Sequence, residues 1–401
     1  MLERRQRVFE HPLVRTIERI REDVEARAEK LVCGCNGKLL RNGTDKRKVQ
    51  TLLGEIEFER TRFRCQGCGK NYYPLDLALG LEPQMKATIG VMERSLWACV
   101  EVSYEKSKQF LEKFTGLEVS RGTIHNMAIE EGRRIEQWEE QRRKEVFEQA
   151  KGVKEPEGKA PDVMYVQVDA TGVNNRASKK WMECKVGASF SQRAYISKNR
   201  FLLVDKRSYA GIEDVDAFGE KFFLDCVKQG VLNAKKIIFI GDGASWIKRL
   251  KEDYFPSSIG VLDIWHLERQ LKDALGEKRK KIVKGCIGLA LMGKGEEIIK
   301  RLKRVFLRVK EEKEREKLLG AIAYVEGNLE GIGNIPLVDG YGSGSVEKTV
   351  DITVCRRFKK RGMSWYSGGA NPLLKLRLLK LNGEWDEYWK KRKEELSRLA
   401  A

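Results

Sequence analysis

Three acidic residues, far apart in the chain, each follow a short apolar strand or a flexible loop. Asp169 follows the strand-like MYVQV and precedes Ala-Thr-Gly, and Asp242 follows KKIIFIG and precedes Gly243. Glu347 follows the Gly/Ser-rich stretch GYGSGSV and lies in the first turn of a predicted helix. Carboxylate oxygens suit Mg²⁺ and Mn²⁺, and neighbouring carboxylates repel one another unless a cation is bound. The three acids therefore indicate a divalent metal site of the kind that cleaves phosphodiester bonds.

The elements around these acids have the order of a mixed α/β domain. Strands are predicted at 164–172, 181–190, 200–206, 235–243 and 259–266, with helices at 212–230 and 245–254. This order resembles an RNase H-like fold, in which the first strand lies beside the fourth. Asp169 and Asp242 would then meet at the sheet edge where α/β folds usually place their chemistry. A single Asp near Gly also suits a turn or a helix cap, so the arrangement carries the hypothesis.

His266, one of three histidines, directly follows the apolar stretch IGVLDIW. With Asp263 and Trp265 beside it, this imidazole could orient a phosphate or a displaced base. A histidine that is buried in the core or caps a helix explains the position equally well. Asp263 also competes with Glu347 for the place of third metal ligand.

Four of the nine cysteines are closely spaced near the amino terminus: Cys33, Cys35, Cys65 and Cys68. Between the two pairs, TLLGEIEFERTRFRC alternates as in a β-hairpin, which would bring the pairs together. Four thiolates form a closed structural Zn²⁺ site. The second pair has the usual CxxC spacing, whereas a single residue separates the first pair. We expect a zinc-ribbon-like site, with a reduced hairpin without metal as the alternative.

A helix-turn-helix is predicted at 103–138. SYEKSKQFLEKF has apolar residues at helical spacing, TGLEVS supplies a turn, and Ser120 can cap the helix that begins RGTIHNM. Arg121, Thr123 and Asn126 stand at the start of this second helix, where side chains can reach base edges of DNA. A purely structural helix pair is the alternative.

A basic cluster follows Glu347 and surrounds Phe358 with five cations: Arg356, Arg357, Lys359, Lys360 and Arg361. A run of charge is most often a solvated surface. Next to a phosphodiester site, however, it would hold the DNA backbone, with a base stacked on Phe358 or Trp365. The remaining tryptophans that we considered are expected to be core anchors: Trp181, Trp246 and Trp385.

The chain has 401 residues, a net charge of +19 and 34% charged residues. The surplus of Lys and Arg favours polyanions such as DNA, because each neutralised phosphate releases counterions. The first residues, MLERRQRVFEHPLV, are too charged for a signal peptide, and no apolar run approaches the length of a membrane span. We therefore expect a cytoplasmic protein with reduced cysteines and no membrane partner.

Changes in composition divide the chain into six predicted segments. The stretch QAKGVKEPEGKAPD contains Gly and Pro and lacks apolar periodicity, which is typical of a linker. The segments are an N-terminal helix with a zinc-ribbon-like part (1–80), a helix-turn-helix region (81–150), the linker (151–162), the first part of an RNase H-like core (163–266), a helical insertion (267–335), and the last part of the core with the third acid and the basic cluster (336–401).

Together these motifs resemble the ISLre family of bacterial insertion-sequence transposases. The resemblance rests on VDATGVNNR (168–176), GDGASWI (241–247), LDIWHLERQL (262–271), and GSVEKTVD with RRFKKRGMSW (344–365). It continues through CQGCGK, SYEKS to VSRGTIHNM, GGANPLLKLR and LNGEW, and so covers most of the chain. It implies an acidic triad of Asp169, Asp242 and Glu347, a helical insertion before the last acid, and a functional histidine, here His266.

The resemblance implies a DNA transposase that cuts the ends of an insertion sequence with Mg²⁺ or Mn²⁺ and joins the freed 3′-hydroxyl to target DNA. Such enzymes act on double-stranded DNA and usually form homo-oligomers on it. Two rival functions remain: an RNase H-fold DNA nuclease without strand transfer, and a non-catalytic DNA-binding regulator derived from a transposase. The presence of all three acids argues against the regulator.

Overall fold

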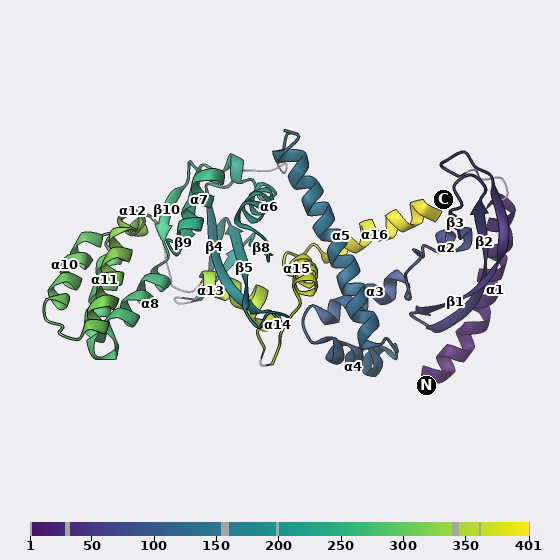
Figure 1. Cartoon of the computed structure of the whole chain (residues 1–401), viewed down its shortest axis with the longest axis horizontal. Coiled ribbons are helices and arrows are strands. Elements are labelled where there is room, and N and C mark those ends of the chain that lie inside the picture. Colours follow the sequence, from purple (N-terminus) through teal and green to yellow (C-terminus); the bar gives the residue numbers. More distant parts are fainter. Residues whose placement is uncertain are drawn as a thin grey trace. The chain divides into compact units, whose positions relative to one another are not determined.

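The chain is a mixed α/β protein with many helices and with sheets of three, five and two strands (Figure 1). The computed structural model describes residues 2–28, 33–153, 160–197, 200–338, 345–360 and 362–400. The chain divides into two compact units, residues 1–132 with 383–401, and residues 133–382. This division falls inside helix α5 (Arg121–Phe147). Of the predicted linker, residues 154–159 lie outside the described residues.

A long antiparallel hairpin dominates the sheet of the first unit. The hairpin consists of β1 (Leu39–Thr51) and β2 (Gly54–Cys65), and the short β3 (Asn71–Tyr72) pairs with β2. Helix α1 (Leu2–Ala28) packs beside this sheet. Alternate side chains of the hairpin, among them Val49, Ile56 and Phe58, form a small core with Ile17 of α1. The hairpin predicted between the two cysteine pairs is confirmed.

The rest of the first unit is helical: α2 (Pro74–Ala78), α3 (Ile89–Cys99), α4 (Tyr104–Thr115), the start of α5 and α16 (Trp385–Ala400). Ser103 caps α4, which ends at Gly116 with a φ of 69°. The hydroxyl of Ser120 accepts a hydrogen bond from the Thr123 N–H at 3.0 Å, as expected for the cap of α5. The predicted pair of helices with a Gly-containing turn is therefore present.

The second unit contains a five-stranded mixed sheet in the order β10-β9-β4-β5-β8. The strands are β4 (Val163–Asn174), β5 (Trp181–Phe190), β8 (Arg207–Gly211), β9 (Lys236–Gly241) and β10 (Ile259–Leu262). β4, β9 and β10 run parallel, whereas β5 is antiparallel to both β4 and β8. The strand that carries Asp169 thus pairs with the strand that leads to Asp242, as the sequence predicts.

Helices cover both faces of this sheet. On one face, Met164, Val166 and Val168 of β4 pack with helices α6 (Val215–Val227) and α7 (Ser245–Tyr254). Because side chains alternate along a strand, Asp169 points to the other face. That face is covered in part by a block of helices: α8 (Ile264–Leu275), α9 (Lys280–Leu291), α10 (Gly295–Phe306), α11 (Glu312–Glu326) and α12 (Leu329–Gly333). The predicted helical character of 267–335 is confirmed.

The last part of the second unit returns to the sheet. It comprises α13 (Ser345–Val350), a π-helical stretch (Asp351–Cys355), α14 (Arg356–Phe358) and α15 (Ser367–Leu381). α13 contacts β4 and β5, and α15 contacts β8. The chain therefore carries Glu347 back to the strands that carry Asp169.

One predicted strand of the core is wrong. The stretch 200–206 forms β7 (Arg200–Val204), which among the described strands pairs only with β6 (Gln192–Ser197), in a separate ribbon. The third core strand is instead β8, directly after it in the chain. Four of the five β8 residues are buried, so the strand lacks the alternation of exposed and buried positions by which strands are detected.

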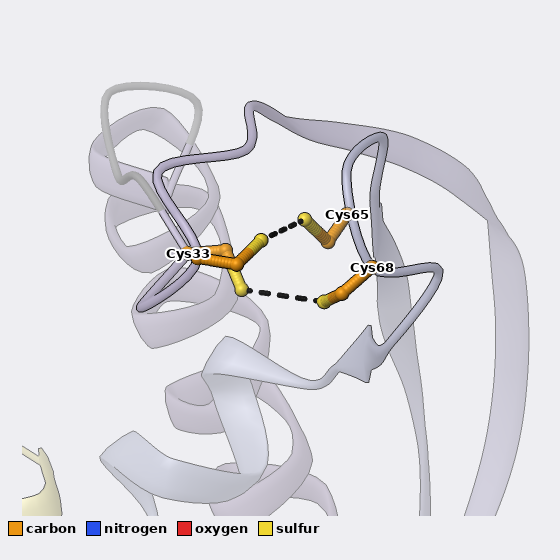
Figure 2. A group of neighbouring side chains, drawn as sticks. Cys33, Cys65 and Cys68 are labelled. Carbon is orange, nitrogen blue, oxygen red and sulfur yellow. Dashed lines mark hydrogen bonds between the residues drawn. The ribbon is translucent and has the colours of Figure 1, made fainter.

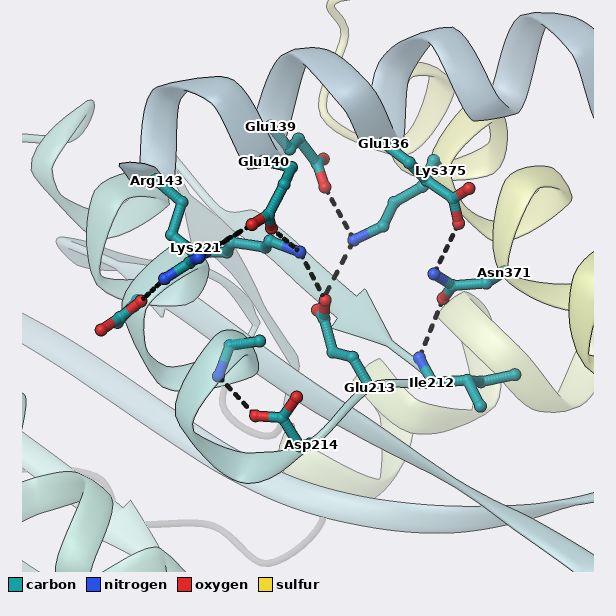
Figure 3. A network of polar contacts seen from close by, with 12 residues as sticks. Glu136, Glu139, Glu140, Arg143, Ile212, Glu213, Asp214, Lys221, Asn371 and Lys375 are labelled. Atoms are coloured by element: carbon teal, nitrogen blue, oxygen red, sulfur yellow. Dashed lines mark hydrogen bonds and ion pairs between the residues drawn. The ribbon is translucent and has the colours of Figure 1, made fainter. Parts of the chain in front are cut away.

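A buried polar network holds α15 and the second half of α5 to the sheet (Figure 3). The ammonium group of Lys375, on α15, lies 2.9 Å from Glu139 of α5 and 3.8 Å from Glu213, which follows β8. It also donates to the hydroxyl of Tyr209 at 2.7 Å. The side chain of Asn371 donates to Glu136 and accepts from the Ile212 N–H. Because the network is buried, each charged side chain needs its partners to offset the free-energy cost of removing the charge from water.

Replacing Lys375 by alanine is expected to lower the free energy of unfolding by about 3–5 kcal/mol, because two largely buried carboxylates lose their shared cation. Urea unfolding followed by circular dichroism measures this change. The matched control is Lys235→Ala, which removes an exposed ion pair with Asp162 and should leave stability unchanged. Equal effects of the two variants would contradict the role given to the network.

Candidate metal and nucleic-acid site

Asp169 lies within β4, not at its end as predicted. The antiparallel pairing of β4 with β5 continues to Asn174, whereas the parallel pairing with β9 ends at Gln167. Asp169 therefore lies just beyond the end of β9, at the part of β4 with which β9 no longer pairs. Its Oδ1 accepts a hydrogen bond from the Ala170 N–H at 2.7 Å. Burial, with the neighbouring Asp242 and Asp263 carboxylates, raises the pKa of Asp169 despite the opposing effect of His266.

Asp242 directly follows β9 in a tight turn. Its Oδ1 accepts a hydrogen bond from the Ala244 N–H at 2.8 Å. Gly243 has a φ of +85°, and a Cβ there would lie 2.3 Å from the side-chain oxygen of Asn328. The hydroxyl of Tyr324, on α11, donates to the backbone carbonyl of Asp242 at 2.7 Å. The helical block thus fixes the backbone that presents this carboxylate.

His266 lies in the first turn of α8, and Asp263 is the N-cap of that helix. One oxygen of Asp263 accepts the Trp265 N–H at 3.1 Å, and the other lies 2.8 Å from Nδ1 of His266. The opposite nitrogen, Nε2, lies 3.8 Å from Oδ1 of Asp169. Burial lowers the pKa of His266, but the surrounding aspartates outweigh burial and raise it. The cap and the histidine are therefore parts of one acidic cluster.

Glu347 lies on α13, which contacts β4 and β5, and its carboxylate reaches the same cluster. Its Oε1 lies 3.9 Å from Nδ1 of His266. Both carboxylate oxygens are buried without a hydrogen-bond partner among the described residues. Burial and the nearby Asp263 carboxyl raise the pKa of Glu347 to about 7. A buried carboxylate with two unsatisfied oxygens needs a cation or a proton.

These side chains form two groups able to hold a metal ion. Asp169 and Asp242 form one with His266, and Asp263 and Glu347 form the other, again with His266. In each group, ligand atoms lie within 4.8 Å of one another. Carboxylate and imidazole donors, a surplus of acid and the unsatisfied oxygens of Glu347 fit divalent cations. The three predicted acids are thus divided between two groups that share the histidine.

Sequence reasoning gave one residue of this site only an alternative role and missed another. Asp263, considered only as a rival of Glu347, lies together with it. Tyr324, which supports Asp242, stands 82 positions later in a helix whose pattern shows only a buried face. A contact across so many residues has no local signal, whereas the N-cap position of Asp263 before an apolar helix could have been recognised.

The basic cluster after Glu347 is only partly exposed. Arg356 is exposed and pairs with Asp351 at 2.8 Å. Lys359 donates to the Thr171 hydroxyl at 2.9 Å, two residues beyond Asp169, and Lys360 is exposed. Arg361 lies outside the described residues. Lys359 and Lys360 thus keep the predicted access to a DNA backbone.

Two predictions for this cluster are wrong. Arg357 and Phe358 are each only 1% exposed, because the helical periodicity of α14 turns them inward. The guanidinium of Arg357 lies 4.9 Å from the centre of the Trp365 ring, so it serves packing. Phe358 packs against Trp365 with ring centroids 4.9 Å apart, and its buried ring cannot stack on a base.

The expected core tryptophans behave differently from one another. Trp385 is buried and Trp246 is half-buried, as predicted. Trp181 is 66% exposed, so the prediction that it anchors the core is wrong. The β4–β5 hairpin extends beyond the strands on either side of it, and Trp181 lies on that extension.

The proposed DNA-reading positions of α5 lie at its amino-terminal end. Arg121 and Asn126 are exposed, and Thr123 is half-buried beside the Ser120 hydroxyl at 2.9 Å. Within the part of the chain that the structure describes, the exposed guanidinium of Arg121 forms only a long ion pair, 3.9 Å, with Glu105 of α4. Arg121 and Asn126 are therefore accessible to a ligand.

The four clustered cysteines of the first unit meet at the end of the hairpin. Figure 2 shows the thiols of Cys33, Cys65 and Cys68 turned toward one another. The sulfur of Cys33 lies 3.6 Å from that of Cys68, and the sulfur of Cys35 lies 3.4 Å from that of Cys65. All four sulfurs lie within 4.8 Å of one another. A tetrahedral zinc site with Zn–S bonds of about 2.3 Å separates its sulfurs by about 3.8 Å, so the four thiols fit Zn²⁺.

The surroundings of the thiols fit the same interpretation. A Cβ on Gly37 would lie 2.5 Å from the Cys65 sulfur, so the backbone closes tightly around the group. Hydrogen bonds from the Cys35 N–H and from the Tyr72 hydroxyl lower the pKa of Cys33 to about 6. The single-residue spacing of the first pair does not keep Cys33 or Cys35 away from the group.

The chain belongs to UPF0236, an uncharacterised protein family, which it matches over residues 1–394. It is similar to a UPF0236 protein of Caldanaerobacter subterraneus subsp. tengcongensis, with 26% identity over 92% of this chain and 73% of the relative. The name of that relative joins eleven locus designations of the one organism. A UPF0236 protein of Streptococcus gallolyticus, named for the vanSb 3′ region, is 24% identical over 96% of this chain and 82% of its own length.

No helix among the described residues combines the length and the apolar character that crossing a membrane requires.

Proposed function

We propose that this protein is a metal-dependent DNA transposase with an RNase H-like catalytic core. It would act on double-stranded DNA in the cytoplasm, cutting the ends of an insertion sequence and joining them to target DNA. The observation that carries the proposal is the meeting of Asp169, Asp242, His266 and Glu347, supplied by two adjacent parallel strands and two helices. The strand order, in which the first core strand lies between the second and the fourth, supports it.

The relatives supply a second line of support. One protein that occupies many loci of one genome is what a mobile element would produce by repeated insertion, and the name of one relative joins eleven locus designations. The net charge of +19 and the exposed Lys359 and Lys360 beside the acidic cluster suit a DNA backbone.

In the proposed reaction the acidic side chains hold the metal and the basic ones hold DNA. Divalent cations bound by these acids would polarise the scissile phosphodiester and stabilise the departing oxygen. Asp263 fixes the ring of His266 through the hydrogen bond to Nδ1, so that Nε2 faces Asp169. Lys359, held at Thr171, would bind a phosphate near the cut. In the joining step the 3′-hydroxyl forms a new bond to a target phosphorus, and the target strand leaves as a new 3′-hydroxyl.

The experiment that tests the proposal uses the purified full chain with DNA that flanks its reading frame. We expect Mg²⁺- or Mn²⁺-dependent nicking at the element ends, and covalent joining of a pre-cut end with a free 3′-hydroxyl to plasmid DNA. Cleavage without any joined product would instead identify a nuclease. Metal-independent binding without cleavage would identify a regulator.

Two further variants separate the roles of Glu347 and Asp263. Glu347→Gln is expected to weaken Mn²⁺ binding more than 100-fold if its orphaned oxygens hold the metal, and Asp263→Asn about 10–100-fold through the histidine it orients. Asparagine keeps the helix cap, so Asp263→Asn changes charge and not folding. Titration calorimetry with Mn²⁺ measures both affinities. The reverse ranking would make Asp263 the third metal ligand.

A further inference from the structure

Two exposed aromatic rings lie near the far end of the β4–β5 hairpin, whose strand β4 carries Asp169, and have no role in the proposed reaction. Trp181, at the start of β5, is 66% exposed, and Tyr366, just before α15, is 58% exposed. Large aromatic side chains bury much apolar area when they pack, so such exposure points to a ligand when other features agree.

Both rings are tied to the far end of the strand that carries Asp169. Trp181 pairs with Asn174 in the β4–β5 register. The backbone N–H of Trp365 donates to the Asn174 carbonyl at 2.9 Å, which fixes the adjacent Tyr366. Asn174 is five residues after Asp169, about 17 Å along a strand. Trp181 and the backbone of Tyr366 therefore lie near the end of the hairpin whose strand β4 carries Asp169.

The Trp181 ring extends back along β4 toward the acids. A Cβ on Gly172 would lie 3.0 Å from this ring, so glycine is what allows the indole to lie against the strand. Strand alternation places Trp181 and Asp169 on opposite faces of the hairpin. The side chain of Lys359 lies at the edge of the hairpin, between these two faces. Its ammonium group lies 2.9 Å from the Thr171 hydroxyl and 5.9 Å from the centre of the Trp181 ring.

Cations surround the two rings. The guanidinium of Arg176 lies 5.6 Å from the centre of the Tyr366 ring. Lys179 and Lys180 are exposed in the turn before Trp181 and form no ion pair with another described residue. The acid on this side of the hairpin, Glu183, already pairs with Lys185 at 3.0 Å. Exposed aromatic rings among unpaired cations are the chemistry that binds unstacked bases and their phosphates.

We propose that Trp181 and Tyr366 form a stacking platform for an unpaired base of the DNA bound at the acidic cluster. The preferred substrate is then DNA with a displaced or single-stranded nucleotide about 17 Å from the cleaved bond, the distance that separates Asn174 from Asp169 along β4. This inference rests on the proposed function, since it names the form of DNA that the same site takes. The role that the sequence suggested for Phe358 or Trp365 passes to Trp181 and Tyr366, because Phe358 is buried and Trp365 is half-buried.

The test compares a blunt DNA duplex with the same duplex carrying a single-stranded tail that contains 2-aminopurine. Binding of the full chain is followed in Ca²⁺ by fluorescence anisotropy. We expect tighter binding of the tailed duplex, and quenching of 2-aminopurine by stacking. Trp181→Ala should weaken binding of the tailed duplex by about 10-fold or more and abolish quenching, with blunt-duplex affinity within about 2-fold. Trp181→Phe should restore most of the preference.

The matched control is Trp138→Ala. Trp138 is also exposed and lies 5.6 Å from a lysine ammonium group, that of Lys228, but it belongs to α5 and not to the hairpin. The inference is overturned if Trp181→Ala keeps the tail preference, if Trp138→Ala loses it equally, or if the wild type shows none. Nicking assays on supercoiled DNA judge the proposed function separately, because tail binding in Ca²⁺ does not depend on cleavage.

Discussion

Asp169→Asn is expected to lower metal-dependent DNA cleavage by at least about 10³-fold while leaving DNA binding intact. Asparagine has the same size and can still accept the Ala170 N–H, so only the charge that holds the metal is lost. Because burial raises the pKa of Asp169, the neutral side chain is also easier to bury. The metal-free variant should therefore unfold at the same temperature as the wild type or at a higher one.

This pairing of lost activity with retained stability separates a catalytic from a structural role. Plasmid nicking in Mg²⁺ and thermal unfolding in EDTA give the two measurements. Asp216→Asn is the control, because Asp216 is exposed and pairs with Arg249 at 2.8 Å on the face of the sheet that α6 and α7 cover. Cleavage by Asp169→Asn at the rate of the Asp216 variant would remove the acidic cluster from the mechanism.

The juxtaposition of Asp169 and Asp242 could be predicted because each follows a short apolar stretch of the sequence. Short apolar strands can be recognised from the local sequence, and the order of strands along the chain allows only a few sheet topologies. Glu347 was joined to them on the Gly/Ser-rich approach to its helix and on the resemblance, and not on strand order. Nothing in residues 336–346 indicates which strand the following helix contacts. The register of a returning helix is set by packing, as the network around Lys375 illustrates.

Exposure was the property that the sequence predicted least well. Arg357 and Phe358 stand in a charged run that suggests a solvated surface, yet one turn of helix buries both. Trp181 has a large aromatic side chain of a type that is usually buried, yet the β4–β5 hairpin extends beyond the neighbouring strands and leaves it exposed. In each case the amino-acid type favours one outcome, and the local structure, a turn of helix or a long hairpin, produces the other. The division of acids between two groups that share His266 likewise needed coordinates.

Cys65→Ser is expected to release a structural zinc ion from the first unit. The wild-type chain should carry about one Zn²⁺, and the variant less than about a tenth, since a closed site needs all four thiolates. The apolar cluster beside the thiols is small and consists of Ala28, Cys33, Leu39, Phe63 and Cys65. So few buried side chains cannot hold the end of a long hairpin alone, and limited proteolysis should cut the variant between residues 33 and 73.

The control for this variant is Cys99→Ser, which alters a buried cysteine in α3 whose thiol donates to the Leu96 carbonyl at 3.5 Å. It should keep its zinc and its resistance to proteolysis. A wild-type protein purified under reducing conditions without zinc, with the same proteolysis pattern as Cys65→Ser, would favour the reduced hairpin. Such a result would leave the acidic cluster untouched, because the cysteines and the acids belong to different units. Zinc content and Mg²⁺-dependent cleavage therefore test the two metal sites independently.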